Sequence, residues 1–426
     1  MNLSSQEKRS FNNPFIPLKY SNFRYYWIGM CVSLIGTWMQ NLAQPWLAYT
    51  LTKSAFLLGL VGAIQFMPVL LFSLFAGVLI DRLPKKKILF FTQSASLVVT
   101  LILALLDFSG HIQFWHILVL AAALGFVNTL DMPTRQSFVI QLVGKEDLMN
   151  AIALNSAVFN MSRIVGPAIA GLVIGFYGVG MCFLANSISF AAVIISLFFI
   201  HPLTIQTTVT SSKRILADIK DGLNYIYQRR ILFDAVLLLT IIGTFAMNNN
   251  VLIPVFSEVV LKQGSMGMGI LFSFSGVGAL IGAMLFALTS KSGPSKLVIY
   301  VVPTIICIFL ILNSFTTNFL LAGFNIAATG IFFNLFSATI NSTLQINTGN
   351  EFRGRVMSVY TLVFSGSTPI GNLYAGLADD YIGARFGFAA CGIIVLILLI
   401  PVYLYKLRTR NRAEAEDRAP ERLSSG

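Results

Sequence analysis

Long apolar stretches recur along the whole chain and are separated by short polar segments. A helix that crosses a bilayer needs about 20 mostly apolar residues, and twelve stretches meet that length. They cover residues 23–49, 56–80, 88–108, 114–143, 151–177, 179–200, 231–261, 267–289, 297–314, 319–346, 356–382 and 386–407. The pattern therefore predicts an all-α integral membrane protein with twelve transmembrane helices.

Charged residues are too few for a soluble protein of this size. Of 426 residues, 56% are apolar and 11% are charged, against about 25% charged in soluble domains. A surface in water needs more charge than this, whereas a surface in lipid must be apolar. The composition excludes a soluble globule, and we read the net charge of +12 as a topology signal rather than a sign of nucleic-acid binding.

Residues that carry metal or nucleotide chemistry do not cluster in the sequence. The four cysteines lie singly in apolar stretches, and the three histidines form no metal-binding pair. The sequence has no GxxxxGK[ST] loop, so the chain cannot itself be an ATPase. We therefore expect no metal, no cofactor and no enzymatic activity.

The longest polar break divides the spans six and six. Residues 204–212 are rich in Thr and Ser, as in a linker, and residues 214–230 have the apolar spacing of a helix that lies on a membrane surface. No removable signal peptide is expected. The predicted parts are a cytoplasmic tail over 1–20, a six-helix bundle over 21–200, a linker with an amphipathic helix over 201–230, a second six-helix bundle over 231–407 and a disordered cytoplasmic tail over 408–426.

Basic residues are distributed unevenly among the connections. The termini and the even-numbered loops, together with the adjoining ends of the spans, hold 25 Lys and Arg residues, whereas the odd-numbered loops hold only Lys53, Lys262 and Arg385. Because loops rich in Lys and Arg stay in the cytoplasm, this distribution predicts that both termini are cytoplasmic.

An internal repeat supports two copies of a six-helix unit. At an offset of 205 residues, the identical pairs include Gly77 with Gly282, Glu146 with Glu351, Gly166 with Gly371, Ala170 with Ala375, Gly171 with Gly376, and Leu172 with Leu377. A duplicated bundle predicts a binding cavity between the halves that opens alternately to each side of the membrane.

The segment between the second and third spans resembles the loop signature of the major facilitator superfamily. It reads G-V-L-I-D-R-L-P from Gly77 to Pro84 and continues with three lysines. It departs from the signature at Pro84, where Gly is usual. Residues 51–55, 131–136 and 166–171 resemble the branch that contains the enterobactin exporter and macrolide efflux proteins. The resemblance covers the twelve spans and implies two pseudo-symmetric bundles in a bacterial inner (plasma) membrane.

The resemblance also implies a gating role for this loop. Gly77 allows close helix contact, and Asp81 lies where a carboxylate can face a helix N-terminus. In the resembling superfamily this acid helps to hold the two halves together when the cavity faces outward. We carry this role over to Asp81, Arg82 and Lys86, with Arg135 as a candidate partner. Anchoring of the topology is the alternative for the basic residues.

The fifth predicted span carries a Gly-Pro motif. Gly166, Pro167 and Gly171 resemble the motif typical of antiporters, with Ala170 where Gly is often found. Small residues permit a tight helix crossing, and the proline bends the span. Simple helix packing and a direct link to exchange remain alternatives.

Charges inside the predicted spans are the sharpest functional signal, because each is costly unless it is paired or hydrated. Asp131 and Arg163 each lie 16 residues from the turn near Asp147. At 1.5 Å per residue, both would lie about 24 Å from that turn, near the midplane. We hypothesise that the two residues form a pair that lines or braces the cavity, with Asp131 as a protonation site. A permanent structural ion pair is the alternative.

Polar amides complete the candidate substrate site. They lie in spans that line the cavity in the resembling superfamily, although helix-to-helix hydrogen bonding is the alternative for each of them. These amides are Gln40, Asn41, Gln44, Asn128, Asn248, Asn249, Asn250, Asn334 and Asn341.

Together these features favour a proton-coupled exporter of a small amphipathic molecule, either a siderophore or a macrolide-like drug. The expected partners are this substrate, protons and membrane lipid, with no nucleic acid, and the chain is expected to be a monomer. An importer or a lysolipid flippase on the same fold remains open. An integral-membrane enzyme is disfavoured by the scarcity of clustered acids and histidines.

Overall fold

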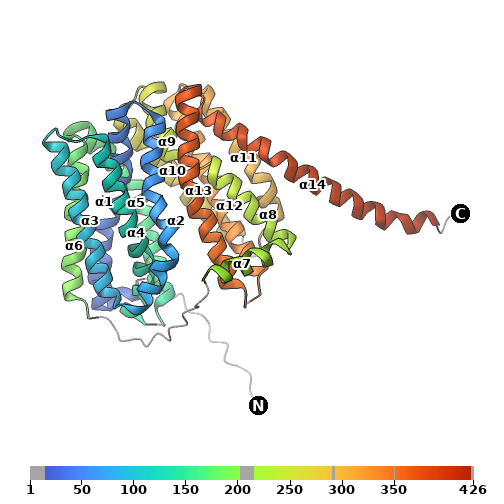
Figure 1. Cartoon of the computed structure of the whole chain (residues 1–426), viewed down its shortest axis with the longest axis horizontal. Helices are drawn as coiled ribbons and strands as arrows, with labels where there is room; N and C mark the ends of the chain where they lie inside the picture. The colour runs from blue at the N-terminus through green and yellow to red at the C-terminus, as the bar shows by residue number, and fades with distance from the viewer. Residues whose placement is uncertain (1–14, 145, 202–214, 290–292, 350, 424–426) are drawn as a thin grey trace, which may run out of the picture. The chain divides into compact units, whose positions relative to one another are not determined.

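The computed structural model describes residues 15–144, 146–201, 215–289, 293–349 and 351–423. Every regular element within these ranges is helical (Figure 1), which confirms the all-α prediction. The helices are η1 Ile16–Lys19, α1 Ser21–Thr52, α2 Ala55–Arg82, α3 Lys85–Phe108, α4 Phe114–Val143, α5 Leu148–Tyr177, α6 Val179–Phe199, α7 Ile215–Tyr227, α8 Arg230–Phe245, α9 Asn249–Val255, η2 Phe256–Val260, α10 Gly264–Thr289, α11 Lys296–Phe315, α12 Phe319–Ile346, α13 Arg353–Ile382 and α14 Gly387–Leu423.

Ten helical segments of the described chain are long and apolar enough to cross a membrane. They correspond to ten of the twelve predicted spans. The other two predicted spans are α1 and α13, which have 32 and 30 residues. Their length suffices for a bilayer, but their polar side chains lower their hydropathy. The count of twelve therefore stays a prediction.

The seventh predicted span is interrupted rather than continuous. It consists of α8, α9 and the π-helical turn η2, with a break at Ala246 to Asn248. Three consecutive asparagines follow the end of α8. Asparagine favours turns over helix interiors because its amide competes for backbone hydrogen bonds, so the break falls where the local sequence is least helical.

The chain forms two compact units, each with its own packing. The first unit comprises Met1–Leu47 and Leu71–Ser212, and the second comprises Ala48–Leu70 and Lys213–Gly426. The first part of α2 thus packs with the C-terminal helices, although the sequence places it in the first predicted bundle. The boundaries proposed from the sequence are not decided by this division.

The core of the first unit lies among α1, α3, α4, α5 and α6. Phe23, Tyr26 and Phe138 are essentially unexposed, and Leu89 and Leu197 pack in the same cluster. The rings of Tyr26 and Phe138 meet edge to face at 5.6 Å. Within a bilayer such side chains stabilise the bundle by close packing rather than by transfer out of water.

Glycines allow the closest helix crossing in the second unit, between α10 and α12. A Cβ atom built on Gly278 would lie 2.0 Å from the carbonyl oxygen of Ala327, and one built on Gly282 would lie 2.3 Å from that of Ile331. No larger residue fits at either position without moving a backbone. This spacing of small residues serves helix packing, as it does in many membrane proteins.

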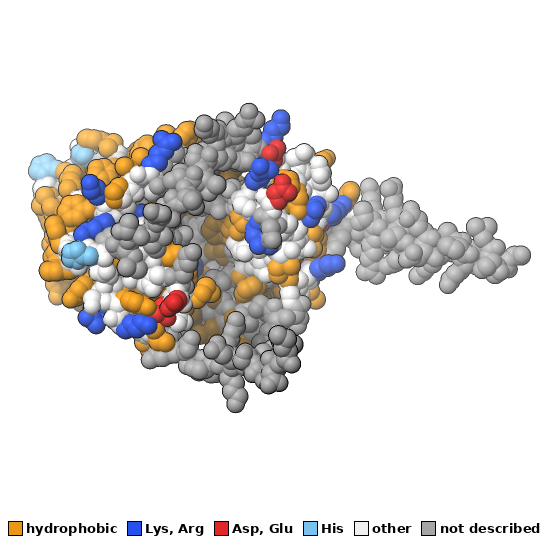
Figure 2. Space-filling model, turned by 90° about the horizontal axis from the view of Figure 1, so that it is seen from below, with side chains coloured by type: hydrophobic (Ala, Val, Ile, Leu, Met, Phe, Trp, Pro, Cys, Tyr) orange, Lys and Arg blue, Asp and Glu red, His pale blue; other side chains and the backbone are white. Residues whose placement is uncertain are grey.

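Large apolar side chains cover the outer surface of the helices. Phe75, Phe176 and Phe198 are 69%, 73% and 63% exposed. Figure 2 shows such hydrophobic side chains at the surface, and it shows Lys and Arg side chains outnumbering Asp and Glu on the face in view. Exposed apolar area of this kind marks contact with lipid.

Two predictions about the connecting segments can be compared with the structure. The amphipathic helix of the linker is present as α7, whereas the Thr/Ser stretch 204–212 lies outside the described residues. Residues 408–423, which the sequence predicts to be disordered, form the last part of α14. The segment is rich in Ala, Glu and Arg, which have high helix propensity, and its disorder stays a prediction.

Candidate functional site

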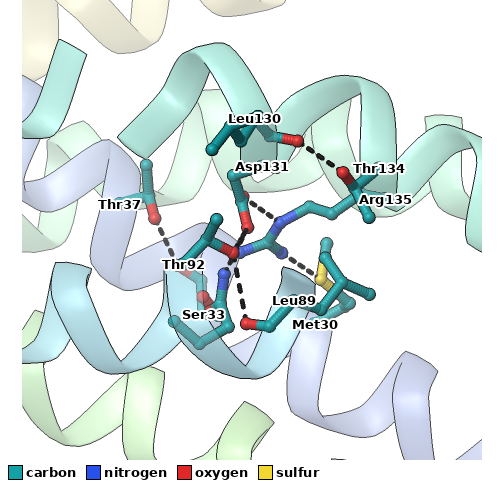
Figure 3. Close-up of polar contacts among 10 residues, drawn as sticks. Met30, Ser33, Thr37, Leu89, Thr92, Leu130, Asp131, Thr134 and Arg135 are labelled. Atoms are coloured by element: carbon teal, nitrogen blue, oxygen red, sulfur yellow. Dashed lines mark hydrogen bonds and ion pairs between the residues drawn. The ribbon is translucent and has the colours of Figure 1, made fainter. Parts of the chain in front are cut away.

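The centre of the candidate site is a buried carboxylate in the middle of α4. Asp131 is the eighteenth residue of this 30-residue helix and is 7% exposed. One of its oxygens accepts hydrogen bonds from Thr92 Oγ1 at 2.6 Å and from Gln93 Nε2 at 2.7 Å. Both donors lie on α3, so the carboxylate joins two neighbouring helices (Figure 3).

Arg135 supplies the charge that balances Asp131. Its Nε atom donates to the second carboxylate oxygen, and another guanidinium nitrogen contacts the sulfur of Met30 on α1 (Figure 3). The two charged residues are four apart on one helix, where side chains are neighbours. A buried ion pair of this kind is stable only while both partners stay charged and hydrogen-bonded.

The predicted pair of Asp131 and Arg163 does not form in this structure. The sequence placed the two residues at a similar depth, but depth does not fix the direction in which each helix turns its side chains. Asp131 is saturated by Arg135 and by two donors of α3, whereas the guanidinium carbon of Arg163 lies 5.9 Å from the ring centroid of Trp38. Within the described residues, no carboxylate lies within ion-pair distance of Arg163.

Thr92 and Gln93 were missed as functional candidates. They are polar residues within the apolar stretch of the third span, and both are fully buried. A polar pair inside a predicted span is itself a signal of interhelical hydrogen bonding. That signal indicates a partner without saying which helix provides it.

The Gly-Pro motif of α5 brings this helix against α1. A Cβ atom built on Gly166 would lie 2.5 Å from the Cβ of Trp38 and 3.1 Å from the carbonyl oxygen of Ile35. Pro167 and Gly171 are buried as well. The expected tight helix crossing is therefore present, and it fixes the position of Trp38 next to Arg163.

The loop between α2 and α3 differs in part from expectation. A Cβ atom built on Gly77 would meet nothing within 4 Å, so the expected close helix contact is absent there. Lys86 donates to the carbonyl oxygen of Ile200 at 2.8 Å, and Arg82 is exposed. The side chain of Asp81 lies outside the described part of the structure, so the proposed gating contact stays a prediction.

The candidate amides fall into two groups. Asn41 and Asn128 are exposed on α1 and α4. Gln44 and Asn248 are buried, where Gln44 accepts from Gln40 at 3.4 Å and Asn248 donates to the carbonyl oxygen of Thr244 at 3.0 Å. Asn341 accepts a hydrogen bond from the Gln345 amide in the next turn of α12. Asn250 is exposed as well, and Asn249, Asn334 and Asn341 are partly exposed, so a substrate could reach several of these amides, whereas Gln40, Gln44 and Asn248 are buried.

A cap that the sequence did not predict joins the end of α13 to the start of α2, inside the second unit. The carboxylate of Asp380 accepts from the backbone N–H groups of Ala55 at 2.7 Å and Phe56 at 3.0 Å, and from Ser54 Oγ at 2.7 Å. A carboxylate here satisfies two helix-terminal donors and faces the positive end of the helix dipole.

At the start of α5, Asp147 binds two groups from the segment that precedes α1. Tyr20 donates to its carboxylate at 2.8 Å, and the Lys19 ammonium lies 3.0 Å from it. These hydrogen bonds, with that from Tyr20 the stronger, lower the pKa of Asp147 below its usual range, and the same contact raises the pKa of Lys19.

This arrangement of a helical membrane domain with a buried charge network can be compared with known proteins. The sequence model of one protein family of the major facilitator superfamily, described as transmembrane secretion effector, matches residues 12–424. The chain belongs to this family.

Relatives of this chain are transporters. It is 24% identical over 393 residues to the staphyloferrin A transporter of Staphylococcus aureus, covering 92% of this chain and 98% of that protein. It is also 24% identical over 394 residues to macrolide efflux protein A of Streptococcus pyogenes, covering 90% and 96% of the two chains. The chain is therefore a multi-pass membrane transporter of small molecules and not an enzyme.

Solved structures confirm the fold of this transporter. The nucleoside transporter NupG matches with a TM-score of 0.69 and 13% identity over 90% of this chain and 98% of its own. A bacterial homologue of the human lysosomal transporter Spinster, solved in an inward-facing and unoccupied conformation, matches with a TM-score of 0.69 and 12% identity over 91% and 97%. At these identities the likeness concerns the fold alone. This fold is the one that the sequence predicts, that of the major facilitator superfamily.

Proposed function

We propose that this transporter exports a small amphipathic molecule from a bacterial cell in exchange for protons. Its relatives include a siderophore transporter and drug efflux proteins, which supports an exported cargo of one of these two kinds. Two six-helix bundles, residues 21–200 and 231–407, rock about a shared cavity by alternating access. Both termini lie in the cytoplasm, as the distribution of Lys and Arg suggests, and the working unit is a monomer.

One observation carries the proton coupling, namely the network around Asp131. A carboxylate at mid-span is the type of group that takes up protons in transporters. Protonation of Asp131 leaves Thr92 and Gln93 only the weaker acceptor of a neutral carboxyl group, and it deprives Arg135 of its counter-charge. We infer that the α3–α4 contact rearranges between the two protonation states, and such a two-state element can couple proton binding to movement.

The proposal is tested with the full chain in proteoliposomes that have an acidic lumen. Proton efflux through an exchanger would then drive uptake of the cargo. The probes are radiolabelled erythromycin and the iron complex of a polycarboxylate chelator. We expect one of them to accumulate, a protonophore to abolish the accumulation, and Asp131→Asn to abolish its dependence on the gradient.

Two results would reject the proposal. Accumulation that needs an acidic exterior instead would indicate import by symport. Accumulation by the Asp131→Asn variant that still follows the pH gradient would remove Asp131 from the coupling mechanism. Asp221→Asn serves as a matched control, because Asp221 is half exposed and pairs only with Arg355 on the surface at 3.4 Å.

A further inference from the structure

Arg163 has no acidic partner among the described side chains of the first unit. The residue is the sixteenth of the 30 residues of α5, and its side chain is partly buried. Two carboxylates are described within the membrane-spanning helices of this unit, and both are engaged elsewhere. Asp131 binds Arg135, and Asp107 accepts from the backbone N–H of Gly180 at 2.8 Å.

A guanidinium without a counter-charge is costly at this depth. An Arg at the centre of a membrane helix is unfavourable on insertion scales, so such residues face a bundle interior or a water-filled cavity. The Trp38 ring offsets part of this cost by a cation–π contact. That contact uses one face of the guanidinium plane and leaves its N–H donors, which lie in the plane, directed elsewhere.

Neighbouring side chains give this region both polar and aromatic character. Asn41 is exposed three residues after Trp38 on α1, and Asn160 lies three residues before Arg163 on α5. Residues at this spacing lie on one helix face. The ring of Phe159 meets that of Trp38 edge to face at 5.7 Å. Arg163 is thus flanked by hydrogen-bonding amides and by a two-ring apolar wall.

The depth of Arg163 decides between two sources of an anion. With about 15 residues of helix on either side, the side chain lies roughly 22 Å from each end of α5. The hydrocarbon half-thickness of a bilayer is about 15 Å, so a lipid headgroup phosphate stays too far away. Of these two sources, a molecule that enters the protein is the one that can bring an anion to Arg163.

We propose that Arg163, held against Trp38, binds a carboxylate of the transported molecule and makes the transporter selective for anionic over cationic cargo. The fork of guanidinium donors matches a carboxylate in two parallel hydrogen bonds, and an uncompensated positive charge repels a cationic drug. This inference rests on the proposed transport function and narrows its substrate class to amphipathic carboxylates.

The test measures binding without a proton gradient, so that its outcome is independent of proton coupling. The full chain in lipid nanodiscs is titrated with carboxyfluorescein and rhodamine 6G, which share a three-ring core and carry opposite charge. We expect the wild type to bind the anionic dye at least tenfold more tightly. Arg163→Gln should remove this preference, Arg163→Lys should keep part of it, and Arg163→Glu should reverse it.

Arg353→Gln is the matched control, because Arg353 is an exposed arginine at the start of α13. It removes one positive charge without touching the region around Trp38, and its dye preference should equal that of the wild type. Thermal unfolding of each variant identifies any that fails to fold. If Arg163→Gln fails to fold, the dye preference of Arg163→Lys is compared with that of the wild type instead. Tighter binding of rhodamine 6G by the wild type, binding of neither dye, or an unchanged preference in Arg163→Gln would overturn the proposal. Failure of pH-driven transport alone would reject the proposed function and leave this inference standing.

Discussion

Asp380 caps α2, because its carboxylate oxygen accepts a 2.7 Å hydrogen bond from the backbone N–H of Ala55, which lies 325 residues earlier in the chain. The same carboxylate binds Phe56 and Ser54. The cap fastens the first turn of α2 to the last turn of α13 within the second unit. No local sequence pattern in either segment predicts the contact.

Removal of this cap should destabilise the protein. We expect Asp380→Ala to lower the free energy of unfolding by about 1 to 2 kcal/mol, because helix-capping residues contribute that much. Asp380→Asn should lose less, since an amide oxygen still accepts a hydrogen bond. Denaturant unfolding in detergent measures both. Asp221→Ala, which removes an exposed ion pair, should change stability by less than about 1 kcal/mol. Equal effects at the two positions would contradict the account of the cap.

The pair of Asp131 and Arg135 should show strong energetic coupling. Arg135→Gln leaves a buried carboxylate without its cation, and we expect a loss of about 3 to 5 kcal/mol. The double variant Asp131→Asn with Arg135→Gln should recover part of this loss, because no uncompensated charge remains. A double-mutant cycle in unfolding experiments measures the coupling. Additive effects would mean that the two side chains do not interact.

Two glycines should respond in opposite ways to the same change. Gly166→Ala places a methyl group 2.5 Å from the Trp38 Cβ, and overpacking of this kind costs about 1 to 3 kcal/mol. Gly77→Ala meets open space and should stabilise α2 by about 0.5 to 1 kcal/mol through helix propensity. Thermal unfolding of the two variants compares them directly. A neutral Gly166→Ala would show that the α1–α5 crossing is looser than described.

The contact of Asp147 with Tyr20 and Lys19 should make stability depend on pH at the acid end. The pKa of Asp147 is lower in the folded protein than its ordinary value of 3.8. A depressed pKa contributes stability that is present above pH 3.8 and is lost as the pH falls through the folded value. We therefore expect Asp147→Asn to lower the melting temperature at pH 6. The difference from wild type should vanish once the pH falls below the pKa of Asp147 in the folded protein. A difference that persists unchanged down to the most acidic pH at which the protein stays folded would exclude this cause.

Predictions from the sequence succeeded where a property is local. Residues 114–143 were predicted as one span and form α4 with the same limits, because a run of apolar residues of that length has few stable places outside a bilayer. The position of Asp131 along its helix also follows from counting residues.

The partners of the charged residues could not all be predicted in the same way. Arg135 lies four residues after Asp131 on the same helix, so this pairing is a local signal that the sequence offers. A contact between Asp131 and Arg163 depends instead on the rotation of α5 about its axis, which the sequence does not show. That rotation depends on packing between helices. At Gly166 of α5, for example, the absence of a side chain leaves room for Trp38 of α1.

The central claim, exchange of cargo for a proton at Asp131, is tested most directly by measuring protons released when cargo binds. Purified transporter in weakly buffered detergent solution is mixed with a probe that it transports, and a pH indicator records the change. We predict release of about one proton per bound probe by the wild type and none by Asp131→Asn at equal probe occupancy. Binding without proton release, or equal release by the variant, would contradict the claim.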